Sequence, residues 1–200
     1  HDTVTGQLQR FLATAGAANQ ELGVQAGGRF VVYDEIRIAG GTDTEVVCAE
    51  FIERYGKFRG SVIVYADATG AAGSSNSARS NHRIIADAYR QHFGRRFLGV
   101  DVPKANPPVA DRVNAVNRAL RRGTLVVNVN RCSHTIDDFV RTSWRDGTHI
   151  IDKVRDREIT HLSDALGYWV HREAPVRAPQ TAARLDLNGA TRSRFAGFKA

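Results

Sequence analysis

The stretch from Ser61 to Ala66 (SVIVYA) constrains the fold of this chain more than any other. It is a nearly continuous apolar run that ends abruptly at Asp67. Runs of this kind are typical of a central strand that other elements cover on both faces. The run therefore predicts a layered α/β fold, with helices on each side of a sheet.

Strand-like and helical patterns alternate on either side of this run. Further strands are predicted at Arg29–Ile38, Phe97–Val102 and Thr124–Val129, the second of them an edge strand that Pro103 stops. Five helices are predicted. The first follows a capping box at Thr42-Asp43-Thr44-Glu45, the second covers Asn81–His92, and the third opens at Pro108 with Gly123 just past its end. The fourth covers Ser133–Trp144, and the fifth follows Thr160. His149-Ile150-Ile151 reads as a short strand. Residues 1–28 are an Ala/Gln-rich stretch, interrupted by glycines, that shows no clear alternation.

Length and charge narrow the class of protein. The 200 residues suffice for one well-packed domain, which we expect to span residues 1–174, with a basic and flexible tail at 175–200. The formal charge of +7 at pH 7 favours a polyanionic partner. No apolar run approaches membrane-spanning length, so we expect no membrane partner. Two distant cysteines without metal-ligand spacing indicate reduced thiols.

Two carboxylates stand out because each lies beside sequence that is predicted to be buried. Asp67 ends the Ser61–Ala66 strand, and Asp164 lies in the first turn of the helix after Thr160. A carboxylate in such a place is costly unless it is hydrogen-bonded, paired or bound to a metal. Two of them converging from distant segments predict a site for a divalent cation, which prefers oxygen ligands.

Plainer roles stay open for the same residues. Asp67 could accept backbone hydrogen bonds from the loop at Gly70–Gly73, and Asp164 could face the positive end of its own helix. His161, Asp164 and Tyr168 follow one another at spacings of three and four, so they share one helix face. His161 is then either an accessory site residue or a solvated one.

Several short motifs, taken in order, resemble the C-terminal nuclease domain of the large terminase subunits of tailed bacteriophages. The resemblance covers roughly residues 29–172. The motifs are Tyr33-Asp34-Glu35-Ile36, Thr42 before a helix, Ala66-Asp67-Ala68-Thr69-Gly70, Asn106-Pro107, Arg112-Val113-Asn114-Ala115-Val116-Asn117, Cys132, and Thr160 to Tyr168 (THLSDALGY).

The resemblance implies an RNase H-like fold, with a mixed central sheet flanked by helices on both faces. It implies an endonuclease that cuts concatemeric double-stranded viral DNA during packaging, with low sequence specificity, at a two-metal site for Mg²⁺ or Mn²⁺. Asp67 matches the family's acidic residue on the fourth strand, and Asp164 matches the one on the C-terminal helix.

The resemblance also implies partners and a location. The family's packaging ATPase domain has no counterpart in this chain, which begins with histidine and contains no methionine; we therefore expect an excised domain. Expected partners are double-stranded DNA, that ATPase domain, the portal protein and the small terminase subunit. The expected location is the cytoplasm of the host cell.

The sequence departs from the family at the first strand, where the family carries its first metal-binding aspartate. The early aspartate here is Asp2, which we take as the third catalytic and metal-binding carboxylate. Asp34 and Glu35 are fallback carboxylates, and solvent exposure at a strand end is their plainer role. Without Asp2 in the cluster, metal affinity should be weak.

Polar and basic residues near the predicted site are candidate DNA contacts, with ordinary solvation as the alternative. They are Ser74, Ser75, Arg79, Lys104 and Arg112. Two rival functions stay open. One is another RNase H-like nuclease, such as a junction resolvase or transposase core, and the other is a non-catalytic module that docks DNA or the portal protein.

Overall fold

A six-stranded mixed sheet forms the centre of the part of the chain that the computed structural model describes, namely residues 10–16, 19–38, 43–71, 79–148, 150–152 and 160–176. Its strand order is β5-β4-β1-β2-β3-β6. Neighbours among β1, β2 and β3 run antiparallel, while β4 and β5 run parallel to β1, and β6 runs parallel to β3. The strands are β1 (Arg10–Gly16), β2 (Asn19–Ala26), β3 (Arg29–Arg37), β4 (Ser61–Ala66), β5 (Phe97–Asp101) and β6 (Leu125–Val127).

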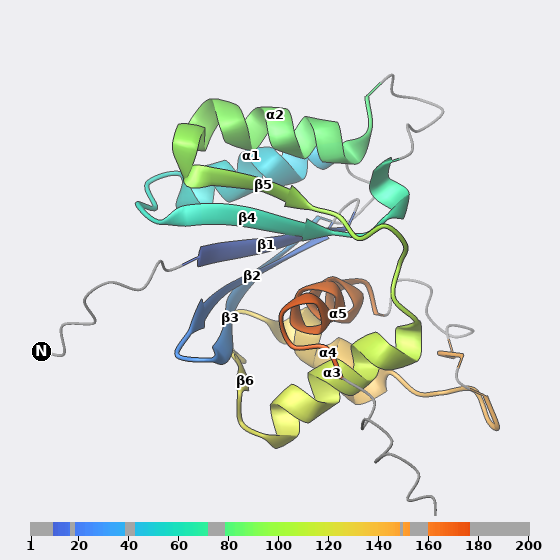
Figure 1. The fold of residues 1–200 in the computed structure, drawn as a ribbon. Coiled ribbons are helices and arrows are strands. Elements are labelled where there is room, and N and C mark those ends of the chain that lie inside the picture. The colour runs from blue at the N-terminus through green and yellow to red at the C-terminus, as the bar shows by residue number, and fades with distance from the viewer. Residues whose placement is uncertain are drawn as a thin grey trace, which may run out of the picture.

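Helices cover both faces of this sheet (Figure 1). On one face lie α1 (Thr44–Tyr55) and α2 (Asn81–Phe93), and on the other lie α3 (Val109–Arg121), α4 (Ser133–Arg141) and α5 (His161–Glu173). Two short 3₁₀ helices, η1 (Thr69–Ala71) and η2 (Gly94–Arg96), follow β4 and α2. The predicted α/β architecture with a mixed sheet is confirmed.

The strands β1 and β2 lie in the segment whose sequence shows no clear pattern. β1 is paired on both sides, with β2 and with β4, and its sequence RFLATAG is made largely of small residues. A strand in the middle of a covered sheet does not need polar and apolar residues in alternation, which is why sequence patterning missed it.

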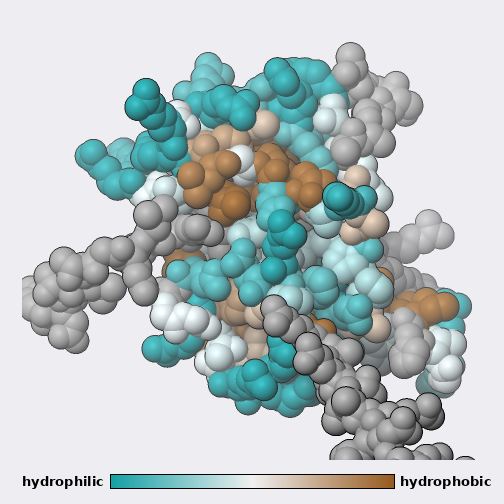
Figure 2. Space-filling view, in the orientation of Figure 1, coloured by the Kyte–Doolittle hydropathy of each residue, from teal (hydrophilic) through white to brown (hydrophobic). Residues whose placement is uncertain are grey.

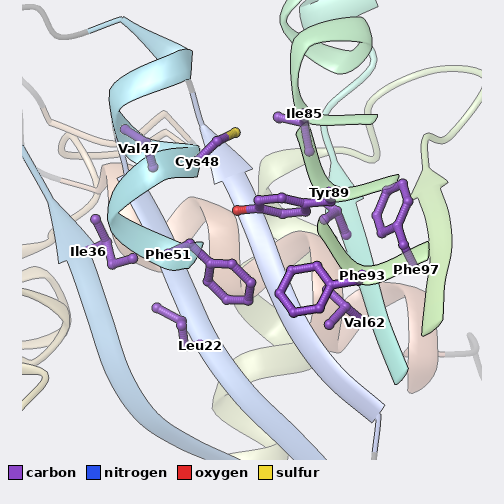
Figure 3. Packing of buried hydrophobic residues seen from close by; sticks show 11 residues of the cluster. Leu22, Ile36, Val47, Cys48, Phe51, Val62, Ile85, Tyr89, Phe93 and Phe97 are labelled. Atoms are coloured by element: carbon purple, nitrogen blue, oxygen red, sulfur yellow. The ribbon is translucent and has the colours of Figure 1, made fainter. Parts of the chain in front are cut away.

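Aromatic rings hold α1 and α2 together above the sheet (Figure 3). Phe51 of α1 lies between Tyr89 and Phe93 of α2, with ring centroids 4.9 Å and 5.9 Å away. Tyr89 also meets Phe97 of β5 edge-on at 5.8 Å. Such pairs stabilise a core by about 0.5–1.5 kcal/mol each beyond the area they bury.

The helix α5 forms the core of the opposite face. Leu162, Ala165, Leu166 and Trp169 are buried, which confirms the predicted apolar face of this helix. Trp169 lies against β2 so closely that a Cβ at Gly23 would come within 2.5 Å of its ring. The glycine is therefore needed for α5 to reach the sheet, and α5 contacts β1, β2 and β4.

Two helix boundaries differ from the sequence prediction, and a third holds without the expected side-chain bond. The cap of α1 is Asp43, whose side chain accepts a hydrogen bond from the Glu45 N–H, so the capping box starting at Thr42 is wrong. The helix α4 ends at Arg141, and Trp144 instead forms a bridge with Ile151. Thr160 is the N-cap residue of α5, as predicted, but its side chain makes no capping bond.

The exterior is mainly hydrophilic on the face shown in Figure 2, with apolar side chains gathered over β5 and the adjoining part of α2. The edge strand β5 leaves Leu98 47% exposed. Within the described residues, no helix has both the length and the apolar character that crossing a membrane requires.

Candidate functional site

Asp67 lies immediately after β4, at the edge of the sheet where three parallel strands end. Ala66 pairs with Ala15 of β1, and Tyr65 pairs with Asp101, the last residue of β5. The carboxyl ends of β1, β4 and β5 therefore meet around Asp67. This is the edge at which open α/β sheets assemble binding sites.

Both carboxylate oxygens of Asp67 accept hydrogen bonds from the turn that follows. The Gly70 N–H donates to Oδ1 at 3.1 Å, and the Thr69 hydroxyl donates to Oδ2. The plainer role predicted for Asp67, an acceptor for the following loop, is what the structure shows. It anchors η1 to the end of β4.

His82, which sequence reasoning missed, lies beside this carboxylate. Its Nε2 is 4.0 Å from Asp67 Oδ1, and its side chain is only 13% exposed. Burial lowers the pKa of His82, against the opposing pull of Asp67, so the ring is neutral at pH 7. A Cβ at Gly70 would come within 2.5 Å of Nε2, so the three residues are tightly packed. The signal that could have revealed it is a histidine in the first turn of the helix after the Asp67 loop.

Asp164 lies in the first turn of α5, and that turn is capped from another helix. Asp138 of α4 accepts hydrogen bonds through Oδ2 from the N–H groups of Leu162 and Ser163, at 3.2 Å and 3.0 Å. Thr160 instead has a left-handed backbone (φ 83°), and its hydroxyl donates to Asp164 Oδ2 at 3.1 Å. The position of Asp164 thus depends on α4.

Arg112 of α3 is the charge partner of Asp164. Its Nη1 lies 2.8 Å from Asp164 Oδ1, and the guanidinium carbon lies 4.3 Å from the centroid of the Tyr168 ring. The arginine side chain is 7% exposed. The side chain is thus turned inward toward α5 and not exposed on the surface, and its predicted contact with DNA stays a prediction.

Tyr168 joins the two halves of the site. Burial raises the pKa of its hydroxyl first of all, Arg112 lowers it, and the carboxylates of Asp67 and Asp164 both raise it further. Both carboxylates must lie near one phenol ring to act on it in this way. Asp67 and Asp164, distant in sequence, thus both act on one phenol ring, and their forming a single site stays a prediction.

Two cavities open beside α5. One of about 290 Å³ is lined by Tyr65, Asp101 and Tyr168 together with the basic side chains of His171 and Arg172. The other, of about 140 Å³, is lined by Arg112, Asp138 and Asp164. Space for a ligand therefore exists beside the first turn of α5, which carries Asp164, and beside its later turns.

Asp34 and Glu35 do not belong to this cluster, and their predicted exposure at a strand end is wrong. Glu35 is 7% exposed and accepts the N–H groups of His134 and Thr135 at 2.9 Å, which caps α4. Asp34 is buried too, and Arg131 lowers its pKa against the effect of burial. Two strands separate β3 from β4, so Glu35 lies about 14 Å from the Asp67 strand across the sheet.

The remaining predicted residues fall in different places. Asp2, Ser74 and Ser75 lie outside the described residues. Arg79 is exposed and bonds Glu45 at 3.0 Å, and Lys104 is exposed in the loop after β5. His161 is partly buried as the first residue of α5. Their roles stay predictions.

Among the described residues, Asp67 and Asp164 do not by themselves complete a metal centre. All four carboxylate oxygens of Asp67 and Asp164 already accept hydrogen bonds from groups of this chain. The first strand, Arg10–Gly16, contains no acidic residue next to Asp67. Across the described part of the chain, no group of three or more His, Cys, Asp and Glu is arranged to hold a metal ion.

The chain is similar to the nuclease domain of the large terminase of bacteriophage SPP1, a structure with bound Mn. The two share 14% sequence identity over 82% of this chain and 85% of that one, with a TM-score of 0.45. No family model matches the sequence, and no curated protein matches it.

Proposed function

We propose that this chain is an RNase H-like nuclease domain of the large-terminase type, which hydrolyses phosphodiester bonds of double-stranded DNA with little sequence preference. The observation that carries the proposal is the convergence of Asp67 and Asp164 around Tyr168, at the edge where β1, β4 and β5 end. The motifs around both aspartates are those that resemble the family.

The charge of the chain suits this substrate. A formal charge of +7 favours a polyanion, and Lys104 is exposed in the loop after β5, at the same sheet edge as Asp67. In the proposed setting the substrate is concatemeric viral DNA in the host cytoplasm. The packaging ATPase domain, the portal protein and the small terminase subunit are the proposed partners.

Mg²⁺ or Mn²⁺ is the proposed cofactor, which when bound would polarise the scissile phosphate and supply hydroxide. Asp67 and Asp164 are the described residues that would hold it, with Asp2 as the third proposed ligand. Because the oxygens of both described carboxylates are already engaged, we expect weak binding.

The test is plasmid cleavage in Mn²⁺, Mg²⁺ and EDTA by the wild type, Asp67→Asn and Asp164→Asn. We expect cleavage in Mn²⁺ by the wild type, none in EDTA, and a loss of at least about 100-fold in each variant, the usual scale for removing a charged active-site group. Asp111→Asn, an exposed first-turn aspartate of α3, is the matched control and should cut normally. Full activity in either site variant would refute the assignment.

A second candidate function is a DNA-docking module without catalysis. It is favoured by the acid-free first strand and by the pairing of Asp164 with Arg112. Binding to linear duplex that persists unchanged in EDTA, with no nicking in any metal, would select this function over the nuclease.

A further inference from the structure

We propose that Arg112 takes the place of a metal ion as the charge partner of Asp164, and that the domain therefore keeps its site folded and neutralised without metal. The proposal rests on the proposed function only in treating Asp164 as a site carboxylate. The family that the sequence resembles binds a metal ion at its site, whereas in this chain the basic side chain of Arg112 lies against Asp164.

The local sequence places Arg112 where a core residue would stand. The buried positions of α3 are Arg112, Ala115, Val116 and Ala119, which follow the three–four spacing of an apolar stripe. A charged side chain in such a stripe is costly unless a partner neutralises it. The carboxylate of Asp164, 2.8 Å away, is that partner.

The surroundings of the pair are shaped for a guanidinium. Gly167 of α5 lies against the arginine, since a Cβ there would come within 3.2 Å of Arg112 Cβ. The ring of Tyr168, one turn after Asp164, lies 4.3 Å from the guanidinium and supplies a π face. Nη1 also reaches the backbone oxygen of Asp164 at 3.4 Å. All of these groups belong to α5: the carboxylate and the carbonyl of Asp164, Gly167, and the ring of Tyr168.

A metal ion would have to compete with this arrangement. A cation bound to Asp164 Oδ1 would lie within a few ångströms of the buried positive charge of Arg112, which repels it. The strand next to Asp67 supplies no further carboxylate to offset that repulsion. Arg112 is therefore expected to weaken metal binding, and its removal to strengthen it.

The test measures Mn²⁺ binding directly, by electron paramagnetic resonance of free Mn²⁺, in the wild type, Arg112→Met, Asp164→Asn and the double variant. Methionine keeps a long apolar stem beside Gly167 and removes the charge. We expect Arg112→Met to bind Mn²⁺ at least about tenfold more tightly than the wild type. The two proteins with Asp164→Asn should show no such gain.

Arg121→Met is the matched control, because Arg121 is an exposed arginine of the same helix and its loss changes the net charge equally. It should leave Mn²⁺ affinity within about twofold of the wild type, as expected for a screened surface charge. Equal or weaker Mn²⁺ binding by Arg112→Met would overturn the proposal. So would an equal gain in Arg121→Met, which would show a general effect of charge.

A metal-free readout keeps the proposal testable if Arg112→Met folds poorly. In EDTA, urea midpoints of the four proteins should be non-additive, with the double variant less destabilised than the sum of the single changes. Arg112→Lys, which keeps the charge, should recover part of the lost midpoint. Additive midpoints would contradict a direct pair.

Plasmid cleavage by the same proteins separates this proposal from the nuclease function. If Mn²⁺ affinity rises in Arg112→Met while no protein cuts DNA, the nuclease function fails and the role of Arg112 stands. If the wild type cuts DNA and Arg112→Met binds Mn²⁺ no more tightly, the nuclease function stands and the role of Arg112 fails.

Discussion

At the scale of single residues, the buried acids of this chain act mainly as helix caps and ion-pair partners. Glu35 binds the first N–H groups of α4, and Asp138 binds those of α5. Each carboxylate stabilises a helix that begins far away in sequence. Buried acidic residues here are thus not by themselves signs of a metal site.

Glu21 shows what deep burial does to a carboxyl group. It is fully buried on β2, opposite Glu35, and burial raises its pKa well above 4.5. The Thr135 hydroxyl bonds both Glu21 Oε1 and Glu35 Oε2. Since that hydroxyl carries one proton, a protonated Glu21 that donates to it leaves it free to donate to Glu35.

Replacing Glu21 with glutamine should therefore alter how stability depends on pH. The folded protein binds this proton more tightly than the unfolded chain, so the contribution is complete below pH 4.5 and is lost as the pH rises through the raised pKa. Relative to the wild type, Glu21→Gln should gain stability as the pH rises from 5 to 7. Urea denaturation at both pH values measures this. Parallel profiles for the two proteins would contradict it.

At the scale of elements, the position of Asp164 is fixed by two other helices. α3 supplies Arg112, and α4 supplies the cap through Asp138, while Trp169 holds α5 on the sheet over Gly23. Sequence spacing identifies the apolar face of α5 correctly. It does not reveal that its first turn is capped by a residue more than twenty positions earlier.

Removal of this cap should loosen the turn that carries Asp164. Asp138→Ala leaves the N–H groups of Leu162 and Ser163 without their acceptor and should cost about 1–2 kcal/mol. The readouts are urea denaturation and faster amide exchange at these two residues. Asp137→Ala, an exposed neighbour on α4, is the control and should change neither. Equal effects of both substitutions would show that the cap contributes nothing.

At the scale of the whole molecule, the parallel strands β4 and β5 give the domain two distinct ends. Lys104 follows β5 at the end where Asp67 lies, whereas Lys57 precedes β4 at the opposite end, about 20 Å away along the strand. Both lysines are exposed, so they form a matched pair for locating the DNA surface.

DNA binding should weaken with salt, and Lys104 should contribute to that dependence more than Lys57. We expect the dissociation constant for linear duplex to rise at least about tenfold between 50 and 200 mM salt. Lys104→Gln should reduce the slope of log affinity against log salt by about one, and Lys57→Gln should leave it unchanged. Fluorescence anisotropy measures both. A salt-independent affinity would rule out an electrostatic DNA surface.

The sequence alone was enough to predict the layered α/β class, the central strand Ser61–Ala66, the apolar face of α5, and Asp67 and Asp164 as candidate site residues. These depend on local patterning, which sequence records directly. The folded chain was needed to reveal where the first strand lies, which group neutralises Asp164, and that Glu35 and Asp138 cap helices. Those facts depend on which distant segments touch, and a basic residue in a helix looks the same in sequence whether it faces water or, like Arg112, a buried carboxylate.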